Sequence, residues 1–313
     1  MGLAALGRPA YINLGRDTDL GRDRAVATME RRCHGMLDAA LAAGVRYVDA
    51  ARSYGRAEEF LASWLADRGV APGTVTVGSK WGYRYTGDWR MDAPVQEVKD
   101  HSLAMFRRQL GETTALLGRH LGLYQVHSAT LDSGVLDDRG VLVALAELAA
   151  TGVAVGLSVS GPRQAEVVRR AMEVEVDGVQ PFSSVQATWN LLEPSAGPAL
   201  AEAHARGWGV IVKEVLANGR LAGRHDVGGD GGAGVVAGVA AGRGATVEEV
   251  ALAAALGRPW ADVVLSGAVT PAQLDTGLRA LGFGLDDDDV ARLGDVAEAP
   301  ESYWQHRAAL PWR

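Results

Sequence analysis

The sequence predicts an α/β domain in which a parallel sheet closes into a barrel. Short apolar runs, several of them β-branched, alternate with longer amphipathic segments, and eight such strand-then-helix units can be counted in 313 residues. Strands alternating with helices form parallel sheets covered by the helices, and a closed sheet of eight strands leaves no exposed edge. A doubly wound open sheet is the alternative, but the opening GLAALGRP does not fit the G-x-G-x-x-G that usually follows its first strand. We therefore predict one (β/α)8 TIM barrel domain over residues 1–313.

The units follow one another along the whole chain. The predicted strand and helix pairs are 2–7 with 27–43, 45–49 with 57–67, 75–79 with 95–110, 121–127 with 141–150, 153–159 with 163–174, 184–188 with 198–206, 209–215 with 247–256, and 263–265 with 271–281. Thr246 followed by Glu249 is a capping box, in which a hydroxyl and a carboxylate satisfy free amide donors. Pro271 suits the first position of a helix.

Two unusual segments have plain interpretations. The acidic run 286–289 could be a metal cluster, but we interpret it as the first turn of a final helix, where carboxylates are favoured. The Gly-rich segment 225–245 is not followed by Gly-Lys-Ser/Thr, so it does not fit a phosphate loop. We interpret it as a mobile loop on the active-site face, where loops often act as lids.

Composition and charge exclude several classes of function. The net charge of −7 argues against a nucleic-acid surface, which needs a basic patch. No uninterrupted apolar window is long enough for a membrane span, and the first residues lack the features of a signal peptide, so we expect a cytoplasmic protein. Cys33, the one cysteine, excludes an intrachain disulfide and a Cys-based metal motif, and its helical spacing predicts a buried structural thiol. We expect no metal.

Ionisable side chains lie where predicted strands end. Asp49, Lys80 and His127 close the second, third and fourth strands, and Tyr54 follows Asp49 by five residues. The carboxyl ends of barrel strands converge on one pocket, so these groups should meet there. A nearby ammonium favours a phenolate, so Lys80 could lower the pKa of Tyr54, with Asp49 holding the ammonium in place. The alternative interpretations are a structural salt bridge beside a surface tyrosine, and a structural histidine.

These four residues and their contexts resemble the aldo-keto reductase family. Asp49 and Tyr54 stand in VDAARSYGRAEEFLASWL, Lys80 in VGSKWG and His127 in LGLYQVHSA, matching that family's tetrad in order. The resemblance implies hydride transfer between a nicotinamide, NADP(H) or NAD(H), and the carbonyl carbon of an aldehyde, ketone or sugar-like substrate, or the alcohol in reverse. Tyr54 would then be the general acid or base, and His127 would orient the carbonyl.

The resemblance extends to a cofactor site with several departures. Ser158 and Gln186 match residues that hold the nicotinamide carboxamide, 216–221 with Leu216 and Asn218 matches a loop over the pyrophosphate, Ser266 and Gly267 match a phosphate-binding turn, and Gln273 matches an adenine-side position. The usual asparagine after Ser158 is Val159, Lys213 stands where an aromatic residue commonly stacks on the nicotinamide, and Gly277 replaces an adenine-facing asparagine. Val269 replaces the basic residue that grips the 2′-phosphate of NADPH, so the choice between NADPH and NADH stays open.

Aromatic residues near the strand ends suggest a substrate pocket. Trp81 and Tyr83 follow Lys80, and Trp304 lies in the C-terminal tail, which folds over the barrel mouth in relatives. Such rings form apolar pockets or stack on sugars, but they also pack loops onto a barrel. Two other functions remain as alternatives: a barrel that binds nucleotide or a partner without turnover, and a non-redox lyase or isomerase on the same fold. The sequence leaves the oligomeric state open.

Overall fold

The computed structural model describes residues 1–223 and 232–312, and within them a parallel sheet forms the centre of the molecule. Seven described strands pair in the order β1-β2-β5-β6-β7-β8-β9. Their bounds are β1 Tyr47–Asp49, β2 Thr76–Trp81, β5 Leu121–Ala129, β6 Ala154–Val159, β7 Ser184–Thr188, β8 Gly209–Lys213 and β9 Val263–Val264. Each pairing between neighbours is parallel.

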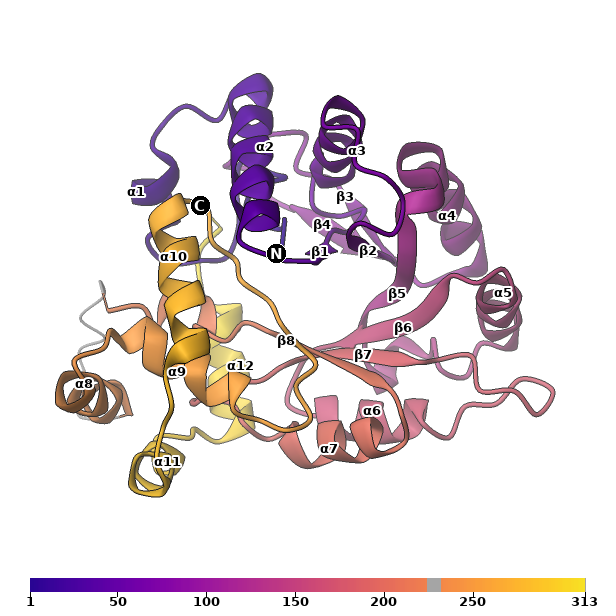
Figure 1. The fold of residues 1–313 in the computed structure, drawn as a ribbon. Helices are drawn as coiled ribbons and strands as arrows, with labels where there is room; N and C mark the ends of the chain where they lie inside the picture. Colours follow the sequence, from indigo (N-terminus) through magenta and orange to yellow (C-terminus); the bar gives the residue numbers. More distant parts are fainter. Residues whose placement is uncertain (224–231, 313) are drawn as a thin grey trace.

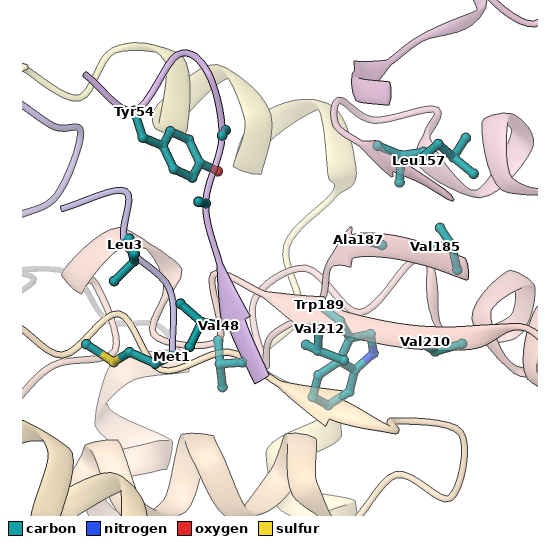
Figure 2. Close-up of a cluster of buried hydrophobic side chains, with 14 of the residues drawn as sticks. Met1, Leu3, Val48, Tyr54, Leu157, Val185, Ala187, Trp189, Val210 and Val212 are labelled. Carbon is teal, nitrogen blue, oxygen red and sulfur yellow. The ribbon is translucent and has the colours of Figure 1, made fainter. Parts of the chain in front are cut away.

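The first three residues close the sheet. Gly2 bridges Asp49 of β1 in parallel, and the Leu3 amide donates to the Asp49 carbonyl at 2.9 Å. On the other side, the Gly2 amide donates to the carbonyl of Ser266, just beyond β9, at 2.8 Å. Met1 and Leu3 accordingly lie beside Val48 in the core (Figure 2). The predicted (β/α)8 barrel is confirmed, with residues 1–3 as its eighth strand position.

Helices surround the barrel on its outside (Figure 1). Those that follow the strands are α2 Val26–Ala42, α3 Ala57–Asp67, α4 Leu103–Leu117, α5 Arg139–Ala150, α6 Gln164–Ala171, α7 Gly197–Ala205, α9 Val247–Leu256 and α10 Pro271–Arg279. The capping box at Thr246 and Glu249 forms, and Thr270 caps α10 with Pro271 in its first turn. Within the described ranges, no helix is both long and apolar enough to cross a membrane.

Additional elements lie outside the alternation of strands and helices. The short helix α1 Arg16–Leu20 precedes α2, the hairpin β3 Tyr83–Tyr85 and β4 Glu97–Lys99 follows β2, and α8 Gly232–Arg243, α11 Asp287–Gly294 and α12 Pro300–Ala308 complete the chain. Short 3-10 turns span Gly118–His120, Leu131–Ser133, Ala217–Gly219 and Ala280–Gly282. The acidic run forms the start of α11, where the Asp286 side chain accepts from the Asp289 amide at 2.9 Å.

The first strand is shorter than the predicted 2–7. The chain turns after Leu3 because the backbone carbonyls that follow accept hydrogen bonds from the buried Arg16 guanidinium. Arg16 donates to the carbonyls of Ala5, Arg8 and Pro9, at 2.6 Å for Pro9 and 2.5 Å for Arg8. A buried guanidinium needs several acceptors, and a curved backbone supplies them where an extended strand would not.

Two further predictions are wrong at the element level. The predicted helix 95–110 begins only at Leu103, because residues 97–99 pair with 83–85 in the β3–β4 hairpin and Ser102 caps the helix by accepting from the Met105 amide at 3.2 Å. The predicted loop 225–245 contains the helix α8, which packs on α9 and α11. Residues 225–231 of that segment lie outside the described residues.

Candidate active site

One large cavity opens at the carboxyl ends of the strands. It has a volume of about 490 Å³, and described residues from every part of the chain line it. The predicted site residues among them are Asp49, Tyr54, Tyr83, His127, Ser158, Gln186, Lys213, Leu216, Asn218, Ser266, Gly267 and Gln273. Parallel strands start on one side of a barrel and end on the other, which is why residues so distant in sequence share one cavity.

Asp49, Lys80 and Tyr54 form a hydrogen-bonded trio. The Lys80 ammonium, fully buried, donates to Asp49 Oδ2 at 2.5 Å, to the Ala50 carbonyl at 3.0 Å and to the Tyr54 hydroxyl at 3.3 Å. The second oxygen of Asp49 accepts from Gln186 Nε2 at 2.8 Å. The ammonium therefore has a fixed position, from which it can stabilise negative charge on the Tyr54 oxygen.

The pKa of Tyr54 is raised well above its ordinary value, which differs from the expectation that Lys80 lowers it. Burial is the largest cause and the Asp49 carboxylate is the second, while the Arg8 guanidinium acts in the opposite direction. Burial also lowers the pKa of the Lys80 ammonium. Tyr54 therefore keeps its proton at neutral pH.

His127 is neutral and faces the cavity next to Tyr54. Burial, and next the Lys80 charge, hold its pKa well below the usual value. Its Nδ1 lies 3.3 Å from the Ser53 hydroxyl, and its ring meets that of Tyr54 edge-on at 5.5 Å between centroids. Because Ser53 can donate to Nδ1, this contact favours the tautomer that carries its proton on Nε2.

Arg8 is a site residue that sequence reasoning missed. Its guanidinium is 2% exposed, pairs with Glu97 of β4 at 2.8 Å and lies 5.3 Å from the centre of the Tyr54 ring. The ring of Trp312, near the end of the chain, lies 4.8 Å from the same guanidinium. The GRPAY context of Arg8 carries no signal for this role, because its neighbours come from segments far away in sequence.

Strands β6, β7 and β8 contribute polar side chains to the same cavity. The Ser158 hydroxyl on β6 accepts from the Ser128 amide at 2.8 Å, which leaves its own proton free for another acceptor. Lys213, at the end of β8, donates to the Thr188 hydroxyl at 2.8 Å. Glu214 follows it and pairs with Arg307 of α12. Arg307 also lines the cavity, and nothing in its local sequence singled it out.

The predicted loop 216–221 lines the cavity and is hydrogen-bonded to the N-terminal segment. Asn218 Nδ2 donates to the Ile12 carbonyl at 2.9 Å, and the Leu14 amide donates to the Asn218 carbonyl at 2.9 Å. Gly219 has φ 98°, and a Cβ there would lie 2.9 Å from the Leu14 Cβ, so glycine permits this close approach. Asn218 Oδ1 is buried without a partner, which leaves one acceptor available inside the site.

The opposite end of the cavity lies at the start of α10. Ser266 and Gly267 follow β9, and the Ser266 hydroxyl lies within 3.3 Å of the Ala268 amide. Gln273 accepts from the Val269 amide at 2.8 Å and donates to Asp19 of α1 at 2.6 Å. Asp19 also lines the cavity, and sequence reasoning did not include it.

Of the three aromatic residues expected at a substrate pocket, Tyr83 alone lines the cavity among the described residues, with its ring 5.0 Å from that of His127. Trp81 has no exposed surface and packs edge-on against Phe106, so it belongs to the core. Trp304 packs outside the lining, under Arg307 and Lys213.

Comparisons with known proteins agree with the fold. A family model described as the aldo/keto reductase family matches residues 20–298. The chain belongs to the aldo/keto reductase family. Its members are oxidoreductases, so the earlier resemblance is confirmed at the level of the family.

Solved structures of the family share the fold. An aldo-keto reductase from Bacillus halodurans, solved in a holo form, has a TM-score of 0.69 and 21% identity, with 92% of each chain covered. A glycerol dehydrogenase from Gluconobacter oxydans has a TM-score of 0.68 and 21% identity, covering 95% of this chain and 90% of its own. Among curated proteins, none matches this sequence.

Proposed function

We propose that this chain is an NAD(P)-dependent oxidoreductase that interconverts an aldehyde, ketone or sugar-like carbonyl with the alcohol, using Tyr54 as the general acid and base. The observation that carries the proposal is the trio at the strand ends, in which the Lys80 ammonium bridges Asp49 and the Tyr54 hydroxyl at 2.5 and 3.3 Å. A phenol that must lose and regain a proton needs a fixed cation beside its oxygen, and this geometry provides it.

The cavity suits an extended dinucleotide. One end holds Tyr54 and His127, and the other holds the N-terminus of α10, and helix N-termini favour phosphate. The unpartnered Asn218 Oδ1 and the free proton of Ser158 add hydrogen-bonding groups between them. Ser158, Gln186, Lys213, Leu216, Asn218, Ser266, Gly267 and Gln273 are the residues that would hold such a coenzyme. When bound, its nicotinamide supplies or accepts the hydride.

The residues of the chain would then manage the proton and the carbonyl oxygen. Neutral His127 donates from Nε2 to the carbonyl oxygen and orients it, and the protonated Tyr54 gives that oxygen its proton. Lys80 stabilises the phenolate left behind, and Asp49 keeps Lys80 charged and in place. Because burial raises the pKa of Tyr54, proton donation in the reductive direction is available at neutral pH, whereas the reverse direction gains as pH rises.

The first test is a titration of the intrinsic fluorescence of the eight tryptophans with NADPH and NADH in parallel. Saturable quenching by either nucleotide is the expected result, and the ratio of the two dissociation constants decides the coenzyme preference. If neither nucleotide binds at millimolar concentration, the proposal fails, and a non-redox barrel becomes the better hypothesis. If nucleotide binds and no carbonyl or alcohol substrate turns over, a non-catalytic nucleotide-binding barrel is the better hypothesis.

A further inference from the structure

Lys213 places a positive charge in the cavity without a carboxylate of its own. Its ammonium donates to the Thr188 hydroxyl at 2.8 Å, and Thr188 in turn donates to Glu214 Oε2 at 3.1 Å. Glu214 is already bound by Arg307. Among the ion pairs within 4.0 Å in the described ranges, none includes Lys213.

The cations that contact Tyr54 and Glu214 are each paired with a carboxylate. Lys80 pairs with Asp49, Arg8 pairs with Glu97, and Arg307 pairs with Glu214. These three pairs are each neutral, so the net charge of the pairs and Lys213 together is that of the Lys213 ammonium. It lies close enough to His127 to contribute to the lowered pKa of that imidazole.

The coenzyme ring must occupy this same end of the cavity if the proposed function is correct, because hydride reaches the carbonyl carbon whose oxygen contacts Tyr54. The two redox states of a nicotinamide coenzyme differ at the ring, which is neutral when reduced and cationic when oxidised. A fixed ammonium repels the cationic ring and so weakens its binding, whereas it has no net charge to repel on the neutral ring.

We propose that Lys213 discriminates between the redox states of the coenzyme, favouring the reduced form over the oxidised form. This inference rests on the proposed function. The protein would then take up reduced coenzyme from a mixed pool, and oxidised coenzyme would leave readily after turnover. Lys213 acts here as a specificity-determining residue, not as a proton donor.

The discrimination should weaken at high pH. Burial is the largest cause that lowers the pKa of Lys213, to about 8, and Glu214 opposes it. The charged groups that face Lys213 from the neighbouring elements are Glu214, Arg307, Lys80 and Asp49, with His127 nearby. Among these residues, His127 is already neutral at pH 7. The ammonium is therefore the group expected to lose its charge as pH rises through about 8.

The test compares the dissociation constants of oxidised and reduced coenzyme, whichever of NAD(H) or NADP(H) binds more tightly, for the wild type and for Lys213→Met. Methionine keeps the length of the side chain and removes the charge. We expect the oxidised-to-reduced ratio of dissociation constants to fall about tenfold in the variant, the size of a partly screened interaction between two unit charges. That change corresponds to a shift of about 30 mV in the potential of the bound two-electron couple.

A control is Arg107→Met. Arg107 lies on the exposed side of α4 and does not line the cavity, so its substitution removes one positive charge without touching the site. Its ratio should equal that of the wild type. A similar fall in both variants would show that the total charge, and not the position of Lys213, sets the ratio, and would overturn the inference.

The wild type gives a second test that needs no mutation. Its ratio should be largest near pH 7 and approach that of Lys213→Met near pH 9.5, and binding of oxidised coenzyme should release more protons than binding of reduced coenzyme at pH 7–8. Proton release is measured by calorimetry in buffers of different ionisation enthalpy. Equal ratios in wild type and Lys213→Met at pH 7 would overturn the inference while leaving the proposed function intact, whereas failure of both coenzymes to bind would overturn both.

Discussion

The chemistry assigned to Tyr54 depends on which groups surround one hydroxyl. The nearest cation, Lys80, is 3.3 Å away, yet burial and Asp49 together keep the phenol protonated. Proximity to an ammonium alone does not set a pKa, because desolvation acts on the phenolate with the opposite sign. At Tyr54 desolvation is the larger effect, so the phenol is protonated at neutral pH. It can act as a base only when pH rises far enough to remove that proton.

Tyr54→Phe tests this assignment. Removal of the hydroxyl should lower turnover in carbonyl reduction by about 10²–10⁴-fold, the usual contribution of a general acid, with little change in the coenzyme dissociation constant. Steady-state kinetics and the fluorescence titration measure the two quantities. Tyr83→Phe is the control, since its ring also lines the cavity against His127 but the Lys80 ammonium bonds Tyr54 instead. Near-normal turnover in Tyr54→Phe would contradict the assignment.

At the scale of elements, α12 is attached to the barrel through a buried ion pair. Arg307 of α12 binds Glu214, and Glu214 holds a left-handed backbone with φ 59°, which residues other than glycine rarely adopt. Burial alone would raise the pKa of Glu214, but Arg307 and then Lys213 lower it to about 2. A carboxylate with a depressed pKa stabilises the fold above its unfolded pKa, and this stabilisation is lost as pH falls through about 2.

Glu214→Gln should therefore destabilise the protein at pH 7. Breaking a buried pair leaves the Arg307 charge uncompensated, so we expect the free energy of unfolding to fall by roughly 3 kcal/mol, measured by chemical denaturation. The difference from wild type should shrink as pH falls from about 4.5 toward 2, because the carboxylate is protonated first in the unfolded chain and only near pH 2 in the folded one. Glu202→Gln, which breaks an exposed pair with Arg169, is the control. Equal effects of the two substitutions would show that α12 is not held by this pair.

At the scale of the whole molecule, the helices and the barrel form one core. Buried apolar side chains from α2, α3, the strands and α12 belong to a single cluster that extends from Met1 to Trp304. Cys33 of α2 lies inside it with no exposed surface, and burial raises the pKa of its thiol to about 12. The thiol can thus react only when α2 separates from the barrel.

Cys33 therefore reports on opening of the barrel. In the native protein at pH 8, reaction with an aromatic disulfide reagent should be slower by orders of magnitude than in the denatured chain, and a saturating coenzyme should slow it further by stabilising the native state. The release of coloured thiolate measures the rate, and the denatured sample should titrate as one thiol per chain. Fast labelling under conditions where the fold is retained would show that α2 opens locally.

The sequence by itself determined what depends on local pattern. Alternating apolar runs specify the strands and helices, Thr246 with Glu249 specifies a helix start, and strand order brings Asp49, Lys80 and His127 to one end of the barrel. These features were predictable because each depends on residues within a few positions, or on the rule that parallel strands end on the same side.

The tertiary structure decided what depends on distant partners. Arg16 shortens the first strand, Arg8 joins the site through Glu97 and Trp312, and Arg307 reaches Glu214 across 93 residues. Burial, a property of the folded chain, reversed the expected direction of the Tyr54 pKa. Charged groups and backbone carbonyls act on the residues nearest to them in space, and burial removes the solvent around these groups. Their effects on pKa values and on chain direction therefore follow from proximity in the fold and not from spacing along the chain.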